Sequence, residues 1–438
     1  MRQVYSKALL AHHIVADWKV RAPRDFLAAT RRVRYTMRMR FLTRLTAVWL
    51  LAVALPLFAA APQLNPAKLA EISKSLAPFI ETNLIAGAVT LVARRGEVVA
   101  LDAIGYSNLD TRRKMKTDDL FWIASMTKPM TAVAVLMLQD EGKLSVEDPV
   151  EKYLPEFKGQ WLTSERSATG VGLVKPARPV LIRDLLTHTS GLGDMPAPRG
   201  DCSLAELVMA YSQMPLKFPP GSKWEYCNSG INTLGRIVEV VSGKPFAKFM
   251  QQRLFERLDM GDTTFWPSRW QMRRVAKPYQ ASPSGALVEG SIYFLKGPLT
   301  DRTRTPFPAG GLFSTASDVA HFYQMMLNGG LWRGKRLLSL AAVTELTRTQ
   351  TGEIKTGFVD GMSYGYGFAV VKEPVANTTR MVSPGTFGHG GAYGTQSWAD
   401  PKRDLIFILM YQWSKVPNGD ASPVRAAFQD AAVQALSE

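Results

Sequence analysis

The sequence contains few of the residues that form disulfides or bind metals. Of its 438 residues, two are cysteine and five are histidine. Cys202 and Cys227 are too few for a disulfide framework in a domain of this size, although they could pair in an oxidising compartment. The cysteines and histidines show no metal-ligand spacing, so we expect neither a metal site nor a cofactor.

Acidic residues are also scarce relative to basic ones. Lys and Arg total 53 against 37 Asp and Glu, a formal net charge of +16. Residues 1–44 hold eleven basic and two acidic residues and so supply +9 of that charge, which leaves only +7 for the rest of the chain. A positive excess confined to one end does not make a basic binding face, so we expect no nucleic-acid partner.

The apolar segment near the N-terminus is shorter than a typical membrane span. Leu45–Ala61 is 17 residues long and contains Pro56, whereas a transmembrane helix needs about 20 residues. Basic residues precede this run and small residues end it, which predicts a secretory signal peptide over residues 37–61, cleaved near Ala60–Gln63. The expected location is periplasmic or secreted. An uncleaved anchor is the alternative and the only membrane contact that we expect.

The 36 residues before this segment are rich in arginine and show no periodicity. Because a signal peptide belongs at a terminus, Met37 or Met39 is the expected true start. We therefore interpret residues 1–36 as a non-native or disordered extension, with a genuine basic extension as the alternative. Residues 62–438 then form the mature domain.

Apolar patterns in the mature chain predict strands near both ends. Two apolar runs within residues 86–106 flank Arg95 and Gly96, which is typical of a β-hairpin. Further strand patterns occupy residues 363–371, 394–400 and 404–412.

Helical patterns surround and separate these strands. Amphipathic helices are expected over residues 64–82 and 423–438, and short helices mixed with Pro/Gly turns fill the middle of the chain. The prediction is an α/β (α+β) fold with one antiparallel sheet, flanked by N- and C-terminal helices. A mainly helical subdomain is expected to be inserted at about 145–380.

The segment FWIASMTKPMTAVAVLMLQDEG, residues 121–142, places Ser125 and Lys128 three residues apart at the start of a helix expected to end at Gly142. At this spacing both side chains lie on one helix face. A serine hydroxyl needs a base, and lysine can serve when desolvation or a nearby cation lowers its pKa. The helix N-terminus also favours developing negative charge. The arrangement suits acyl transfer.

Two later stretches suit the same chemistry. PPGSKWEYCNSGINTLG, residues 219–235, places Tyr226 and Asn228 two residues apart, and a tyrosine hydroxyl beside a lysine could relay a proton to a leaving group. GHGGAYGTQSW, residues 388–398, is a glycine-rich strand entry. Its glycines allow close backbone approach, and a backbone N–H there could complete an oxyanion hole.

Taken in order, the three stretches resemble the motifs of the serine β-lactamase and penicillin-binding protein superfamily. The motifs are Ser125-x-x-Lys128, Tyr226-x-Asn228 and His389-Gly390-Gly391. The resemblance is closest to the branch that holds class C β-lactamases, D-alanyl-D-alanine carboxypeptidases and family VIII esterases. It covers roughly residues 65–435, and it implies the fold of that branch, β-lactamase/transpeptidase-like.

The resemblance implies a role for each matching residue. Ser125 would be the acylated nucleophile, Lys128 its general base and Tyr226 the partner in proton transfer. Asn228 would bind Lys128 or the substrate. The N–H groups of Ser125 and Ala392 would form the oxyanion hole.

The third motif departs from the class C pattern. His389, Gly390 and Gly391 would bind substrate, but typical class C β-lactamases have lysine where this chain has His389. A His-x-Gly motif is more like the D-peptidases and D-aminopeptidases of the branch. In the resembled family this position faces the substrate carboxylate, and an unperturbed histidine titrates near ~6.5. We therefore expect His389 to make activity pH-dependent in that range.

The expected function is a serine acyl hydrolase that acts through an acyl-enzyme on small esters or amides, of the esterase or D-amino-acid peptidase type. A true β-lactamase and a non-catalytic penicillin-binding or sensory module are the alternatives. The expected partner is a small ester, amide or peptide, with a cell-wall peptide as one candidate. His188 is expected to be a structural loop residue. Cys227 is not expected to be a nucleophile, since neither a nearby histidine nor a helix start activates it.

Overall fold

The computed structural model describes residues 65–167, 170–195, 199–292, 294–356, 359–374, 382–414 and 422–436. All of them belong to one compact unit, Ala60–Glu438. The expected extension, signal peptide and cleavage site lie outside the described residues. Within the described ranges, no helix has the length and apolar character of a membrane span.

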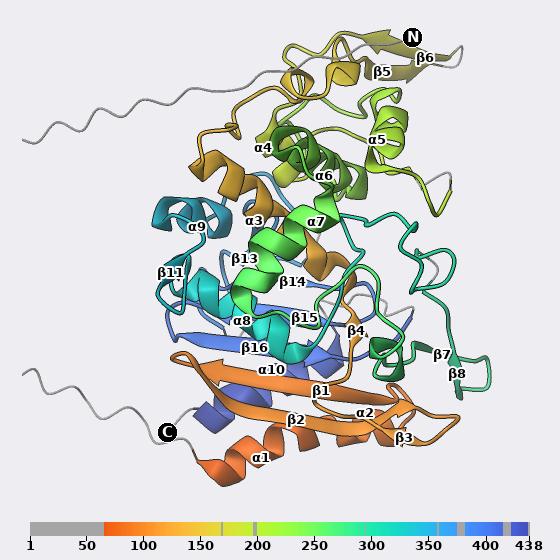
Figure 1. Cartoon of the computed structure of the whole chain (residues 1–438), viewed down its shortest axis with the longest axis vertical. Coiled ribbons are helices and arrows are strands. Elements are labelled where there is room, and N and C mark those ends of the chain that lie inside the picture. Colours follow the sequence, from red (N-terminus) through yellow and green to blue (C-terminus); the bar gives the residue numbers. More distant parts are fainter. Residues whose placement is uncertain are drawn as a thin grey trace, which may run out of the picture. The chain divides into compact units, whose positions relative to one another are not determined.

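Eight of the described strands form one antiparallel sheet, which confirms the predicted fold class (Figure 1). Strands from the start of the unit pair directly with strands from its end, because β1 lies between β2 and β16. In sheet order the strands are β12 (Met362–Tyr364), β13 (Ala369–Val371), β14 (Phe387–Gly390), β15 (Gln396–Asp400), β16 (Leu405–Met410), β1 (Gly87–Arg94), β2 (Glu97–Asn108) and β3 (Arg113–Lys114).

The predicted hairpin joins β1 to β2. Its two loop residues, Arg95 and Gly96, have φ values of 54° and 83°. A type I′ turn needs positive φ at both positions, and this turn matches the right-handed twist of the strands it connects. The sequence signal at this loop is therefore confirmed.

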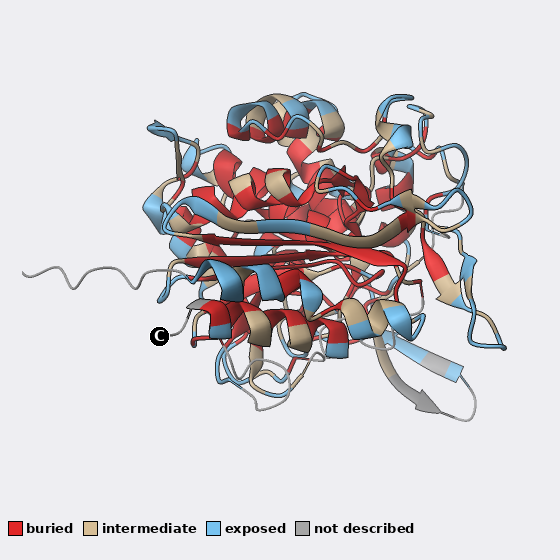
Figure 2. Cartoon of the chain, turned by 90° about the horizontal axis from the view of Figure 1, so that it is seen from below, coloured by how far each residue is buried: buried red, intermediate tan, exposed pale blue. Residues whose placement is uncertain are grey.

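Helices cover both faces of the sheet, and its central strands are therefore buried along their length (Figure 2). The terminal helices α1 (Pro66–Lys74) and α10 (Pro423–Leu436) pack against each other and contact β1, β2 and β16. Helix α8 (Ala316–Leu327) packs against β1, β15 and β16. The predicted flanking helices are thus present, but the segment expected as one helix over residues 64–82 forms two, α1 and α2 (Ala77–Glu81).

Helix α3 (Thr127–Asp140) is buried at every residue from Lys128 to Leu138. It packs against α6, α9 and β14, so the helical region meets the sheet along this helix. The other helices are α2 (Ala77–Glu81), α4 (Ile182–Leu186), α5 (Leu204–Ser212), α6 (Asn228–Ser242), α7 (Phe246–Met250) and α9 (Leu340–Thr347).

Short pairs of strands and single turns connect these helices. The paired strands are β4 (Phe121–Trp122) with β9 (Phe313–Ser314), β5 (Leu162–Ser167) with β6 (Gly170–Val174), β7 (Tyr279–Ala281) with β8 (Leu287–Glu289), and β10 (Leu331–Trp332) with β11 (Lys335–Arg336). The 3₁₀ turns are η1 (Ala124–Met126), η2 (Val150–Lys152), η3 (Pro155–Phe157), η5 (Glu256–Leu258) and η6 (Gln271–Arg273), and η4 (Gln251–Phe255) is a π-helical turn.

The sheet resumes inside the range 145–380, at the strand pattern predicted for residues 363–371. The structure divides this segment into two paired strands of the main sheet, β12 and β13. Each has only three residues, and so short a run gives little periodicity from which to place a boundary.

The turn between β12 and β13 lies against α3 at the level of Lys128. Gly367 has a φ of 74°, and its N–H donates to the carbonyl of Leu186. A Cβ at this position would lie 2.6 Å from the Cβ of Ala132 and 3.2 Å from the carbonyl oxygen of Lys128. Glycine therefore permits both the backbone conformation and the close contact.

We expect Gly367→Ala to lower the free energy of unfolding by about 3 kcal/mol, because it adds overpacking to an unfavourable φ. Gly285→Ala is the control: its φ is 81°, but a Cβ there meets no atom within 4 Å. The control should lose only about 1 kcal/mol. Urea unfolding of both variants measures the difference, and equal losses would contradict the packing argument.

Candidate active site

Ser125 lies in turn η1, immediately before α3, and is partly exposed between buried neighbours. The preceding residue, Ala124, has a φ of 44°, a conformation that costs a non-glycine residue about 1–2 kcal/mol. Two contacts hold this turn: the Thr127 hydroxyl donates to the Ala124 carbonyl at 2.7 Å, and the Leu312 N–H donates to the same hydroxyl oxygen at 3.3 Å. The nucleophile candidate is thus presented on a braced, strained turn.

Lys128 is fully buried, and its Nζ has three polar neighbours. Nζ lies 3.0 Å from Ser125 Oγ, 2.8 Å from Asn228 Oδ1 and 2.7 Å from the Ala309 carbonyl oxygen. The last two atoms can only accept hydrogen bonds. A neutral lysine therefore donates its two hydrogens to them and directs its lone pair at the serine.

The electrostatic environment favours that neutral form. Burial lowers the pKa of Lys128 to about 7, although the negative charge of Asp194 acts in the opposite direction. Removing an amine from water disfavours its charged state. Lys128 can therefore accept a proton near neutral pH.

Tyr226 approaches the serine from the segment that precedes α6. Its hydroxyl donates to Ser125 Oγ at 2.7 Å, and Lys128 Nζ lies 4.7 Å from the centre of its ring. Because Tyr226 donates to Oγ, the hydrogen of the serine hydroxyl remains available to Lys128. The four residues of the first two motifs are thus brought together.

Asn228 begins α6 and is oriented by a residue that sequence reasoning missed. Its Nδ2 donates to Asp194 Oδ2 at 2.9 Å, and the Ser229 N–H donates to Asp194 Oδ1 at 3.0 Å. The carboxylate thereby fixes the amide with Oδ1 toward Lys128 and accepts from an N–H in the first turn of the helix, where negative charge is favourable. No local pattern marks Asp194, because its partners lie more than thirty residues away in the sequence.

A cavity of about 520 Å³ opens in front of these groups. Ser125, Tyr226, Asn228 and Ala392 line it, so the proposed oxyanion residues face the same space. Most of its wall is apolar or aromatic: Trp122, Met195, Tyr211, Phe294, Leu295 and Phe307. Three charged residues, Asp194, Arg199 and Lys296, also line it, and all three are exposed.

The third motif lies differently from the expectation. Of His389, Gly390, Gly391 and Ala392, only Ala392 lines the cavity. A Cβ on Gly391 would lie 2.7 Å from the Ile123 carbonyl oxygen, so this glycine permits β14 to approach the segment that leads into η1.

The expectation that His389 titrates in the usual histidine range is wrong. Its side chain is 2% exposed, and its pKa is lowered to about 3, first by burial and then by the charge of Lys128. Nδ1 lies 2.7 Å from the Gly390 carbonyl oxygen and Nε2 lies 3.2 Å from the Tyr364 hydroxyl. His389 is therefore neutral and turned toward protein groups.

Cys202 and Cys227 are both buried and free. Cys227 does have a helix start and a histidine beside it, contrary to the premise drawn from the sequence: it is the N-cap of α6, and its N–H donates to His188 Nδ1. Burial nevertheless raises the pKa of its thiol to about 12, which keeps it from acting as a nucleophile near neutral pH. Among the described residues, no group of three or more metal-binding side chains is gathered.

Comparison with known proteins identifies the family of the chain. The family model described as Beta-lactamase matches residues 72–431. The chain belongs to the β-lactamase family. Together with the relatives below, this membership makes it a serine hydrolase, and it confirms the predicted superfamily.

Two relatives cover most of the chain. An uncharacterized protein of Mycobacterium tuberculosis (strain CDC 1551 / Oshkosh) is 34% identical over 363 residues, which are 77% of this chain and 88% of that protein. Esterase EstB of Burkholderia gladioli is 30% identical over 377 residues, 79% of this chain and 90% of its own. A solved structure described as EstCE1, a hydrolase with promiscuous acyltransferase activity, matches with a TM-score of 0.69 at 22% identity, covering 84% of this chain and 99% of that one. At this identity the structure supports the fold alone.

We expect kcat/KM to depend on pH, with a midpoint that the charge of Asp194 influences. Because only neutral Lys128 can take the serine proton, kcat/KM should rise with pH and level off above the lowered pKa of about 7. Asp194→Asn removes the negative charge that raises this pKa, so the midpoint should move to lower pH. We also expect a fall in the plateau of roughly tenfold, because one hydrogen bond to Asn228 weakens.

Asp360→Asn is the matched control, since Asp360 is an exposed acid whose partner is the equally exposed Lys355. The measurement is the pH profile of kcat/KM for an uncharged ester. A midpoint that stays in place or rises in Asp194→Asn would contradict the assigned role of this carboxylate.

Proposed function

We propose that the protein is an esterase that cleaves uncharged carboxylic esters with an apolar acyl group, through an acyl-enzyme on Ser125. The observation that carries the proposal is the environment of Lys128 Nζ: it is buried, bonded to two acceptors, and 3.0 Å from Ser125 Oγ. A fixed, uncharged amine at this distance is what general-base activation of a serine requires.

The first half-reaction uses three side chains. Lys128 takes the hydroxyl proton as Ser125 Oγ bonds to the ester carbonyl carbon. The carbon–oxygen bond to the alcohol then breaks, and the leaving oxygen takes the hydroxyl proton of Tyr226, which lies 2.7 Å from Oγ. Lys128 returns its proton to Tyr226, so both end neutral. The N–H groups of Ser125 and Ala392 are proposed to stabilise the tetrahedral oxyanion.

The second half-reaction repeats these steps with water as the nucleophile. Lys128 takes a proton from the water as its oxygen bonds to the acyl carbon. The bond to Ser125 Oγ breaks, Oγ takes the hydroxyl proton of Tyr226, Lys128 returns its proton to Tyr226, and the carboxylic acid leaves.

The cavity wall and the neutral third motif support an uncharged, apolar substrate. Aromatic and aliphatic side chains line most of the space beside Ser125, and burying an acyl chain against them contributes about 0.8 kcal/mol per methylene group. His389 supplies no positive charge for a substrate carboxylate, because its pKa is about 3, and the cations that line the cavity, Arg199 and Lys296, are exposed rather than buried beside Ser125. Relatives named as esterases, Esterase EstB and Lovastatin esterase, add support.

A substrate panel tests the proposal. We expect kcat/KM to rise about tenfold from p-nitrophenyl acetate to the butyrate, from the burial of two more methylene groups. Nitrocefin and D-alanyl p-nitroanilide should react at least a hundredfold more slowly than the best ester. Ser125→Ala should lower the rate by about a thousandfold or more.

Ser284→Ala, which changes an exposed serine, serves as the control and should retain full activity. A fluorophosphonate adduct mapped by mass spectrometry should lie on Ser125. Faster turnover of nitrocefin or of the D-alanyl amide than of any ester would replace the esterase by a β-lactamase or D-peptidase, and an adduct on another residue would overturn the site.

A further inference from the structure

The hydroxyl of Tyr364 lies between two buried histidines behind the active site. It is 3.2 Å from His188 Nε2 and 3.2 Å from His389 Nε2. The three side chains are at most 2% exposed. They join the loop after α4, the edge strand β12 and the third-motif strand β14.

The partners of the outer nitrogen of each histidine determine which ring nitrogen carries the proton. The Cys227 N–H can only donate, and it lies 3.2 Å from His188 Nδ1, so this nitrogen is bare and the proton of neutral His188 is on Nε2. The Gly390 carbonyl can only accept, and it lies 2.7 Å from His389 Nδ1, so that nitrogen carries the proton. His389 Nε2 is then an acceptor.

These assignments leave one arrangement for Tyr364. Its oxygen accepts from His188 Nε2–H, and its own hydrogen goes to His389 Nε2. Every hydrogen bond among these three side chains and their two backbone partners then has one donor and one acceptor. We propose that His188, Tyr364 and His389 form a directional hydrogen-bond chain that positions Tyr226 for proton transfer. The catalytic part of this inference rests on the esterase mechanism proposed above.

His188 holds the Tyr226 segment on both sides. Its carbonyl accepts from the Glu225 N–H at 3.0 Å, and its Nδ1 accepts from the Cys227 N–H. The two bonds bracket Tyr226, whose ring lies 4.6 Å from the imidazole, centre to centre, at 38°. A shift of the imidazole would therefore move the tyrosine hydroxyl away from Ser125.

His188 adopts a strained conformation that its contacts maintain. Its φ is 60°, which is unfavourable for a residue with a Cβ. Side chain and backbone are both bonded to the segment that carries Tyr226, and the ring also bonds to Tyr364. Strain of this kind persists only where surrounding contacts determine the conformation.

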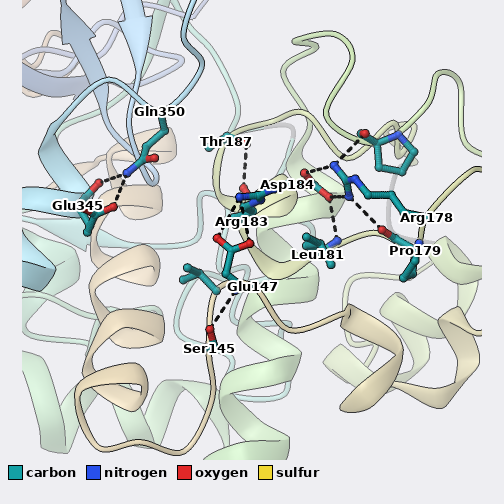
Figure 3. Close-up of polar contacts among 12 residues, drawn as sticks. Ser145, Glu147, Arg178, Pro179, Leu181, Arg183, Asp184, Thr187, Glu345 and Gln350 are labelled. Atoms are coloured by element: carbon teal, nitrogen blue, oxygen red, sulfur yellow. Dashed lines mark hydrogen bonds and ion pairs between the residues drawn. The ribbon is translucent and has the colours of Figure 1, made fainter.

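An ion pair at the start of α4 fixes the same two segments (Figure 3). Arg178 donates to both carboxylate oxygens of Asp184, at 2.6 and 3.0 Å, and also to the Pro220 carbonyl at 2.9 Å. Gly221 donates from its N–H to the Thr189 carbonyl at 2.8 Å. The loop that holds His188 and the loop that holds Tyr226 are therefore linked at several points.

The electrostatics agree with an uncharged chain. The pKa of His188 is held well below its ordinary value, first by burial and then by the positive charges that Lys128 and His389 would carry if protonated. A protonated His188 would also place an N–H against the Cys227 N–H. The hydrogen-bond chain of His188, Tyr364 and His389 therefore keeps its proton arrangement through the pH range in which Lys128 titrates.

The first test removes the bridging hydroxyl. Tyr364→Phe should lower kcat about tenfold, as the loss of one buried hydrogen bond predicts. KM should change by less than twofold, because none of the three residues lines the cavity. Tyr279→Phe is the control: Tyr279 is equally buried, and its hydroxyl accepts from the Leu109 N–H. Rates are expressed per serine titrated with fluorophosphonate, so that misfolded protein is not counted.

A second variant separates coupling from simple packing loss. In the variant His188→Asn, the asparagine tolerates positive φ and supplies an acceptor for the Cys227 N–H. Its shorter side chain cannot also donate to the Tyr364 hydroxyl. The variant should show a similar fall in kcat. The double variant with Tyr364→Phe should lose little more than the larger single loss, because both changes break one chain. Fully additive losses, or an unchanged kcat in Tyr364→Phe, would overturn the positioning role.

Imidazole ¹⁵N NMR of the unaltered protein tests the proton arrangement without any activity. His188 should show the Nε2–H form and His389 the Nδ1–H form, both constant from pH 5 to 8, with signals assigned through His188→Asn and His389→Gln. Titration of either ring in this range, or the same tautomer in both, would overturn the chain. If no ester is turned over but the tautomers are as stated, the esterase proposal fails while the hydrogen-bond chain stands.

Discussion

The site depends on the burial of Lys128 without a carboxylate in contact with it. Its nearest polar atoms are a serine hydroxyl, an amide oxygen and a backbone carbonyl. Keeping an ammonium ion in such a place costs several kcal/mol, so the proton is released near neutral pH instead. The nearest acid in this arrangement, Asp194, contacts Asn228 rather than the lysine, and it moderates the pKa without abolishing the effect.

The fold brings distant segments together around this amine. The start of α6 supplies Asn228, a loop 181 residues away supplies the Ala309 carbonyl, and the β12–β13 turn packs on the Lys128 carbonyl through Gly367. The side chain cannot reach solvent because α3 is buried along the whole stretch that follows it. Burial also explains why His389 is neutral: it lies on β14, which contacts α3, and its ring is buried and close to an amine that can carry positive charge.

The sequence was sufficient for the parts of the site that local spacing encodes. Ser125 and Lys128 lie at one helix start, and Tyr226 and Asn228 lie at another. Outside the site, the hairpin turn at Arg95–Gly96 could be predicted in the same way, from the residues of the turn itself. Asp194, Ala309 and Tyr364 escaped detection because their contacts are made only in the folded chain. The sequence places His389 in the third motif, but its burial and its orientation toward Tyr364 depend on β12 and β14 flanking β13 in the sheet, an order that the sequence does not show.

The central claim is that Lys128 loses its proton near neutral pH, so that a large fraction of the resting enzyme holds the neutral amine at physiological pH. The most direct test is a ¹³C NMR titration of the protein labelled at lysine Cε, with the Lys128 signal assigned by its absence in Lys128→Arg. We predict a titration midpoint of about 7 for this signal, while exposed lysines titrate at about 10.4. A Lys128 signal that remains in its protonated position up to pH 10 would contradict the account.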